Sequence, residues 1–144
     1  MTSPDSLLRR LFQAARAITR DLNAELESEG LFSAEWAILS LLHGAGPASQ
    51  AALAAGLSIE PPAISKALAR LEAKGLVSRG EGPNRRENRV ALSPVAEARF
   101  ALWAERAGAH HARVLAGLTP AETEQLHALL SRLYANVRPG AGDL

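Results

Sequence analysis

The side chains best suited to bind a charged partner lie between residues 60 and 92. Two adjacent arginines, Arg85 and Arg86, follow Asn84 in a stretch rich in glycine and polar residues. Guanidinium groups bind phosphate oxygens and base edges through paired N–H donors. Residues 60–92 hold seven basic and four acidic side chains, a surplus of three, although the net charge of the chain is only +1. The alternative is that these are ordinary solvated side chains. The local surplus favours contact with a polyanion.

Two short helices are expected to precede the arginine pair. Ser49 is suited to cap a first helix that ends at Gly56, because glycine readily adopts the left-handed conformation that ends helices. After a tight connection, Pro61 supplies the first position of a second helix, which Gly75 closes. The sequence therefore predicts a helix-turn-helix over residues 49–75.

The second helix has one apolar stripe, because Ile64, Leu68 and Leu71 recur at helical spacing. The other faces carry Pro62, Ala63, Ser65, Lys66, Ala69 and Arg70. Residues 76–79 and 88–92 alternate as strands do and flank the polar stretch with the two arginines. The expected fold class is therefore mainly α, a winged helix-turn-helix with a small two-stranded wing.

Two segments of this region resemble the MarR family of bacterial transcriptional regulators, the multiple-antibiotic-resistance type. They are Leu-Glu-Ala-Lys-Gly-Leu-Val at residues 71–77 and Arg-Val-Ala-Leu-Ser-Pro at residues 89–94, with the Asn84-Arg85-Arg86 loop between them. The resemblance extends over nearly the whole chain. Three positions depart from the family pattern, because Asn84 replaces an aspartate, Glu60 replaces a serine-like residue, and a glycine that commonly follows the wing is absent.

The resemblance implies a homodimer that binds double-stranded DNA at a pseudo-palindromic operator and is often released by a small-molecule effector. The second helix would enter the major groove, and the wing would enter the minor groove. Expected DNA contacts are Ser49 and Gln50 on the backbone, Pro62, Ala63, Ser65, Lys66 and Arg70 in the major groove, and Asn84, Arg85 and Arg86 on the wing.

Helices are also expected on both sides of this module. Residues 1–30 should form an N-terminal dimerisation helix, residues 31–93 the DNA-binding module and residues 94–144 C-terminal dimerisation helices. Ser3 and Thr119 are suited to cap the first and last of these, and Ser33 to begin the helix between residues 31 and 46. Their apolar stripes are too extensive to be buried against a module of about 60 residues, so they need a partner. The resemblance implies that this partner is a second copy.

Of the expected functional sites, the ligand site is the one for which the sequence contains the least evidence. A cleft between the dimer helices and the winged module, as implied by the resemblance, would be lined by Phe12, Arg16, Trp36, His43 and Trp103. The competing interpretation is that the aromatic residues are core residues. No metal site and no cofactor are expected, because the four histidines lack ligand spacing and cysteine is absent.

Other functional classes receive little support. The chain has no phosphate-binding glycine loop, nucleophile elbow or metalloprotease motif, so catalysis is not expected. It also has no apolar run of the roughly 18 residues that cross a membrane and no signal peptide, so a cytoplasmic protein without membrane contact is expected. The main alternative is a winged helix that serves as a dimerisation or protein-interaction module and has lost specific DNA binding, which Asn84 and Glu60 would favour.

Overall fold

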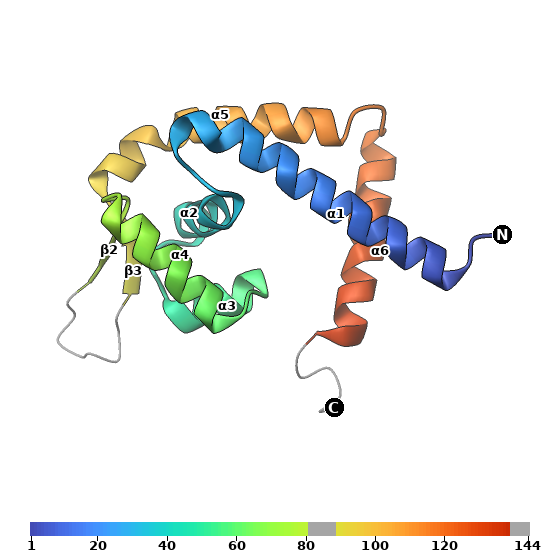
Figure 1. Cartoon of the computed structure of the whole chain (residues 1–144), viewed down its shortest axis with the longest axis horizontal. Coiled ribbons are helices and arrows are strands. Elements are labelled where there is room, and N and C mark those ends of the chain that lie inside the picture. The colour runs from blue at the N-terminus through green and yellow to red at the C-terminus, as the bar shows by residue number, and fades with distance from the viewer. Residues whose placement is uncertain (81–88, 139–144) are drawn as a thin grey trace. The chain divides into compact units, whose positions relative to one another are not determined.

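The computed structural model describes residues 1–80 and 89–138, which form helices and one small antiparallel sheet (Figure 1). Residues Met1–His110 make one compact unit and residues His111–Leu144 a second. The helices are α1 (Pro4–Leu26), the 3-10 turn η1 (Glu27–Glu29), α2 (Ser33–Ala45), α3 (Gln50–Leu57), α4 (Pro61–Ala73), α5 (Pro94–Val114) and α6 (Pro120–Val137). The strands are β1 (Ala48–Ser49), β2 (Val77–Arg79) and β3 (Arg89–Leu92).

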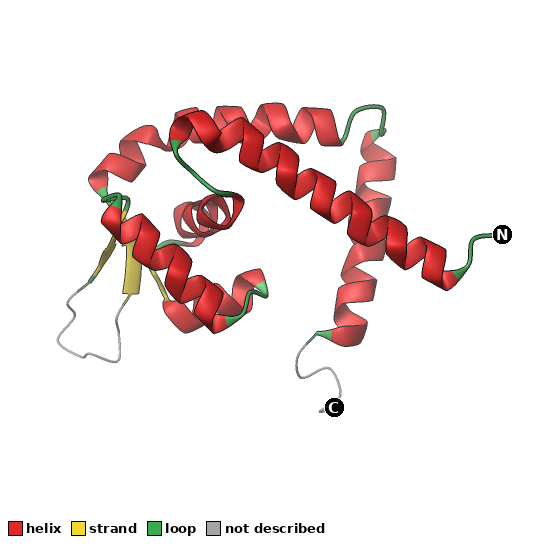
Figure 2. Cartoon of the chain, in the orientation of Figure 1, coloured by secondary structure: helices red, strands yellow, loops and turns green. Residues whose placement is uncertain are grey.

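This element order confirms the predicted fold class, a mainly helical winged helix-turn-helix. Figure 2 shows the strands confined to one region of the first unit, beside α4. α2 occupies the centre of that unit and contacts α1, α3, α4 and β3 (Figure 1). The fully buried side chains around it include Ile38, Leu53, Ile64, Val90 and Trp103. One apolar core therefore fixes α3 and α4 to the rest of the unit.

The helix starts predicted from capping residues are confirmed where the cap is a hydroxyl. The Oγ atoms of Ser3 and Ser49 accept hydrogen bonds from the backbone N–H groups of Ser6 and Ala52, at 3.2 and 3.1 Å. Thr119 and Glu122 form a full capping box. The backbone N–H of Thr119 donates to the Glu122 carboxylate and, with the Thr119 side chain, lowers the pKa of Glu122 below its usual value.

Two expected helix ends are wrong. α3 does not end at Gly56 but continues to Leu57, and Ser58 takes the left-handed conformation with φ of 52°. Gly56 lies close to Leu41 instead, since a Cβ there would come within 3.3 Å of the Leu41 Cδ2. The first α-helix ends at Leu26, and η1 occupies the last turn before Gly30.

The sheet has one strand more than the two predicted. β3 pairs with β2 and also with β1, in the antiparallel order β1-β3-β2. The additional pairs are Ala48 with Val90 and Ser49 with Arg89. A two-residue strand is too short to show an alternating pattern, so β1 could not be predicted from the sequence. Its consequence is that the start of α3 is tied directly to the wing.

Large apolar side chains remain exposed on the helices that flank the module. On α1, Leu7 and Phe12 are 56% and 55% exposed, and Leu8 and Ile18 are also exposed. On α6 the exposed apolar residues are Leu126, Leu129, Leu130, Leu133, Tyr134 and Val137. Exposed apolar surface of this extent is typical of an interaction site.

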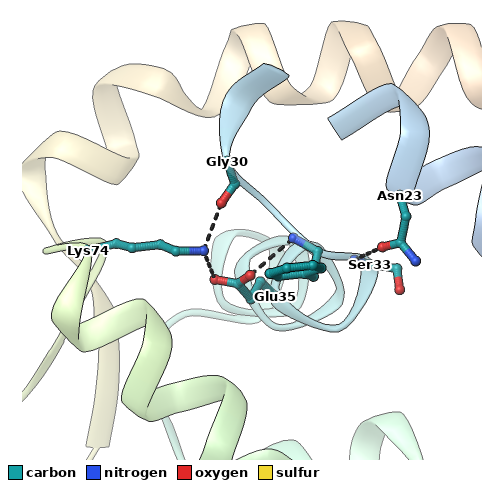
Figure 3. Close-up of polar contacts among 6 residues, drawn as sticks. Asn23, Gly30, Ser33, Glu35 and Lys74 are labelled. Atoms are coloured by element: carbon teal, nitrogen blue, oxygen red, sulfur yellow. Dashed lines mark hydrogen bonds and ion pairs between the residues drawn. The ribbon is translucent and has the colours of Figure 1, made fainter. Parts of the chain in front are cut away.

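A buried carboxylate links the α1–α2 connection to the end of α4 (Figure 3). Glu35 is fully buried, and its Oε2 lies 2.6 Å from the Lys74 Nζ. Its Oε1 accepts a hydrogen bond from the Phe32 backbone N–H at 3.0 Å. Lys74 also donates to the Gly30 carbonyl at 2.7 Å, and the Asn23 Oδ1 accepts from the Ser33 N–H. These bonds fix the position of α4 relative to α1 and α2.

We expect Lys74→Met to lower the free energy of unfolding by about 2 kcal/mol, because it leaves the buried Glu35 carboxylate without its cation. This value is below the usual range for a broken buried pair, since the Lys74 side chain is one-third exposed. Urea denaturation measures the change. The matched control is Arg79→Met, which breaks the exposed Arg79–Glu72 pair and should cost under about 1 kcal/mol. Equal losses in the two variants would contradict the assignment.

Candidate nucleic-acid interface

α4 separates into a buried face and an exposed face. Ile64, Leu68 and Leu71 are fully buried, as predicted from their spacing, and Ala67 is buried beside them. The exposed residues of the helix before its last turn are Pro61, Pro62, Ala63, Ser65, Lys66 and Ala69. Because the stripe anchors α4 in the core, the opposite face is presented to solvent in a fixed orientation.

The N-terminus of α4 has no free backbone donor among its first four positions. Pro61 and Pro62 lack N–H groups, and the N–H groups of Ala63 and Ile64 donate to the Glu60 carbonyl at 3.0 and 3.2 Å. The Glu60 side chain is exposed and makes no capping hydrogen bond. This helix start is therefore unsuited to phosphate binding through backbone amides, which is common at other helix N-termini.

Gln50, the first residue of α3, reaches the exposed face of α4. Its Nε2 donates a hydrogen bond to the Oγ of Ser65. Sequence reasoning placed both residues at the interface but did not predict this bond, because nothing in the spacing of 15 residues indicates it. The bond brings a side-chain amide to the middle of the exposed helix face.

Most of the described cations of residues 60–92 are already engaged. Lys74 is paired with Glu35, and the Arg79 Nε lies 2.7 Å from the Glu72 Oε1. Lys66 and Arg89 are exposed, and within the described part of the chain neither forms an ion pair. These two are the described cations of the segment that are most available to a phosphate.

Arg70 lies against an aromatic ring. Its guanidinium carbon is 5.4 Å from the ring centroid of Phe32, a residue that is 55% exposed. The Arg70 Nε is buried and has no hydrogen-bond partner within the part of the chain that the structure describes. The Nζ of Lys74 lies 5.5 Å from the same ring centroid. The geometry is that of a cation–π contact, which ties the side chain of Arg70 to the α1–α2 connection.

Asn84, Arg85 and Arg86 lie outside the described residues. The strands that flank them are in place, since β2 and β3 pair from Val77–Leu92 to Arg79–Val90 and the Gly80 N–H donates to the Arg89 carbonyl at 2.8 Å. The predicted wing is thus confirmed in its strands.

The aromatic residues expected in a ligand cleft lie mainly in the core. Trp103 is fully buried, and its indole Nε1 has no hydrogen-bond partner among the described residues. Trp36 is buried and stacks on Phe100 with 5.3 Å between ring centroids. His43 is exposed and stacks on the same Phe100 at 3.7 Å. Phe100 therefore joins Trp36 and His43, a grouping that sequence reasoning did not include.

The remaining two residues, Phe12 and Arg16, lie on the exposed part of α1. Arg16 lines a shallow depression of about 390 Å³ with neighbours from α1. A second cavity of about 400 Å³ contains none of the five expected residues. It is lined by Asn23, Ala24, Glu27, Gly30, Leu31 and Phe32.

The described residues contain no group of three or more histidine or acidic side chains arranged to hold a metal ion. Among the same residues, no helix combines the length and the apolar character needed to cross a membrane.

Together, the helix pair α3–α4, the buried stripe and the β2–β3 wing define the protein as a winged helix-turn-helix. Comparison with known proteins specifies the class further. The model of the MarR family matches residues 31–87. The uncharacterized HTH-type transcriptional regulator YwoH of Bacillus subtilis is 35% identical over 94 residues, which are 65% of this chain and 69% of that protein.

Solved structures agree with this match over a longer part of the chain. A mutant MarR from E. coli complexed with operator DNA is 26% identical, with a TM-score of 0.80 over 88% of this chain and 92% of that chain. The organohalide-sensing RdhR transcriptional regulator in its 2,4-dichlorophenol-bound form is also 26% identical, with a TM-score of 0.83 over 92% of this chain and 80% of that chain. The chain belongs to the MarR family of transcriptional regulators.

The contact between Phe32 and Arg70 generates a prediction that does not depend on DNA. In a double-mutant cycle with Phe32→Leu and Arg70→Met, we expect a coupling of about 0.5–1 kcal/mol in the free energy of unfolding, because the contact is partly exposed. Urea denaturation of the four proteins measures the coupling. Additive single losses would mean that the two side chains are neighbours without attraction.

Proposed function

We propose that this protein is a homodimeric, sequence-specific DNA-binding regulator that represses transcription from a pseudo-palindromic operator and is released by a small ligand. The observation that carries the proposal is the exposed face of α4, which is anchored by a fully buried stripe and contains the exposed Lys66. A rigid helix with a solvent-facing side of small and polar residues fits the major groove of B-DNA.

The proposed DNA contacts follow from where the described residues lie. Pro62 and Ala63 allow close approach to thymine methyl groups, and Ser65 and Lys66 supply the polar contacts. Ser49 and Gln50 approach from the start of α3, and Asn84, Arg85 and Arg86 belong to the wing tip. Arg70 is the weakest of the proposed contacts, because its guanidinium is held over Phe32.

The exposed apolar residues of α1 and of α6 support dimerisation. Each helix carries at least four large apolar side chains that one copy of the chain leaves exposed. We assign residues 1–30 and 94–144 to dimerisation and residues 31–93 to DNA binding. In a two-fold symmetric dimer, the two α4 helices need a separation of about 34 Å to enter successive major grooves on one face of the DNA.

Ligand release requires a compound that binds the DNA-competent and incompetent dimers with different affinity. The proposed cleft between the dimer helices and the winged module includes Phe12, Arg16, Trp36, His43 and Trp103. The indole N–H of Trp103 has no hydrogen-bond partner among the described residues, which supports a polar group near this position.

The deciding experiment is a fluorescence-anisotropy titration of the purified protein against its own upstream intergenic DNA and a scrambled duplex, at two salt concentrations. We expect tighter binding to the upstream DNA and a steep loss of affinity with salt, because phosphate contacts release counterions. Light scattering on the same sample should give twice the chain mass of 15.2 kDa. A dimer that binds neither duplex would favour the protein-interaction module instead.

Charge substitutions on α4 test the docking face. Lys66→Ala should weaken binding and reduce the salt slope by about one if Lys66 contacts a phosphate. Glu60→Gln should strengthen binding several-fold, because an exposed carboxylate at the start of α4 repels the DNA backbone.

A third substitution tests the wing. Arg86→Ala should also weaken DNA binding and lower the salt dependence of that binding. Arg113→Ala on α5, outside the proposed DNA-binding module, serves as the matched charge control. If Arg113→Ala changed affinity as much as Lys66→Ala, the assignment of α4 as the docking face would be wrong.

A further inference from the structure

The exposed face of α4 offers few groups that can distinguish one base from another. Of its exposed residues before the last turn, Pro61, Pro62, Ala63 and Ala69 have no polar side-chain atom. Ser65 has a single hydroxyl, and Lys66 is a donor only. Among these side chains alone, none presents a donor and an acceptor on separate atoms, which is the pattern that bidentate reading of adenine requires.

Gln50 supplies that pattern from the neighbouring helix. Its position is fixed at two points, because Ser49 caps α3 through the Ala52 N–H at 3.1 Å and the Gln50 Nε2 donates to the Ser65 Oγ. Gln50 is half-buried, whereas Ser65 is exposed on the helix face that points to solvent. The amide therefore lies beside the middle of that face.

The bond to Ser65 leaves specific groups available. A glutamine amide has two N–H donors and one carbonyl acceptor, and one donor is committed to Ser65. The Gln50 Oε1 and the second N–H of Nε2 form no hydrogen bond within the described part of the chain. One acceptor and one donor of the same amide thus remain available.

This pair of groups matches adenine among the four bases. In the major groove adenine presents the N7 acceptor and the N6 donor, which receive a side-chain amide in two parallel hydrogen bonds. Guanine presents two acceptors, cytosine a donor, and thymine an acceptor beside a methyl group. An amide fixed by a third bond is also pre-organised, since its rotamer is set before DNA arrives.

We propose that Gln50 determines operator specificity by reading one adenine in each half-site, and that Ser65 is the positioning residue that holds its amide. This inference rests on the proposed function and adds the residue and the base to it. It also changes the role of Gln50 expected from the sequence, which was a contact with the DNA backbone.

The test is a selection from a randomised duplex library, followed by anisotropy titration of the selected site and its single-base variants. We expect the wild-type protein to select adenine at two positions related by the two-fold axis and to lose about 5- to 150-fold in affinity when that base pair is changed. Gln50→Ala should abolish the preference at these positions alone. Gln50→Glu should shift it towards cytosine, because a carboxylate accepts from the cytosine N4 group.

Ser65→Ala separates positioning from reading. It removes the acceptor for Gln50, so the adenine preference should weaken while the same base remains favoured. Lys66→Ala is the control on the same face, and it should leave the preference at these two positions intact. Circular dichroism and light scattering on each variant establish that the fold and the dimer are unchanged.

The outcomes distinguish this inference from the proposed function. A wild-type protein that selects no sequence would overturn both. A specific wild-type protein whose Gln50→Ala variant keeps the full base preference and loses only salt dependence would overturn the reading role, and would place Gln50 on a phosphate. An unchanged preference in Ser65→Ala would overturn the positioning role.

Discussion

The position of α4 depends on a buried carboxylate as well as on the apolar stripe that packs into the core. Removing Glu35 from water is costly unless its charge is compensated, and Lys74 supplies that compensation at 2.6 Å. Because Glu35 lies in the first turn of α2 and Lys74 follows the last residue of α4, the pair ties these two helix ends together. The Glu35 Oε1 accepts a hydrogen bond from the Phe32 N–H, and the Oδ1 of Asn23 in α1 accepts one from the neighbouring Ser33 N–H. Two hydrogen bonds and an ion pair therefore connect α1, through the start of α2, to the C-terminal end of α4.

The same pair shows why charge counts alone describe this interface poorly. Residues 60–92 have a surplus of three positive charges in the sequence. In the structure Lys74 compensates a buried carboxylate, Arg79 pairs with Glu72, and Arg70 lies over Phe32. These side chains hold the module together, so fewer remain for a partner. In the function that we propose, specificity then depends more on uncharged groups, and the one that we assign to it is the amide of Gln50.

The sequence predicts this fold well where the cause is local. Ser3, Ser49 and Thr119 cap helices at the predicted positions because a hydroxyl needs only the N–H three residues later. The stripe of α4 follows from spacing alone. Features that depend on distant partners were not predicted. β1 forms only by pairing with β3, and the burial of Glu35 depends on Lys74, which is 39 residues further along the chain. The bond from Gln50 to Ser65 likewise crosses from one helix to the next. The wing tip, whose arginines are expected from the sequence to contact DNA, lies outside the described residues.

The placement of the two tryptophans has an optical consequence. Trp36 and Trp103 are the only tryptophans in the chain, and both are buried in the unit Met1–His110. Intrinsic tryptophan emission therefore reports on the core of that unit, while α6 contributes no indole signal. Trp36 stacks on Phe100, and His43 stacks on the same ring, so an exposed imidazole lies one ring away from a fluorophore. The emission of this protein carries information about α2 and α5 without any added label.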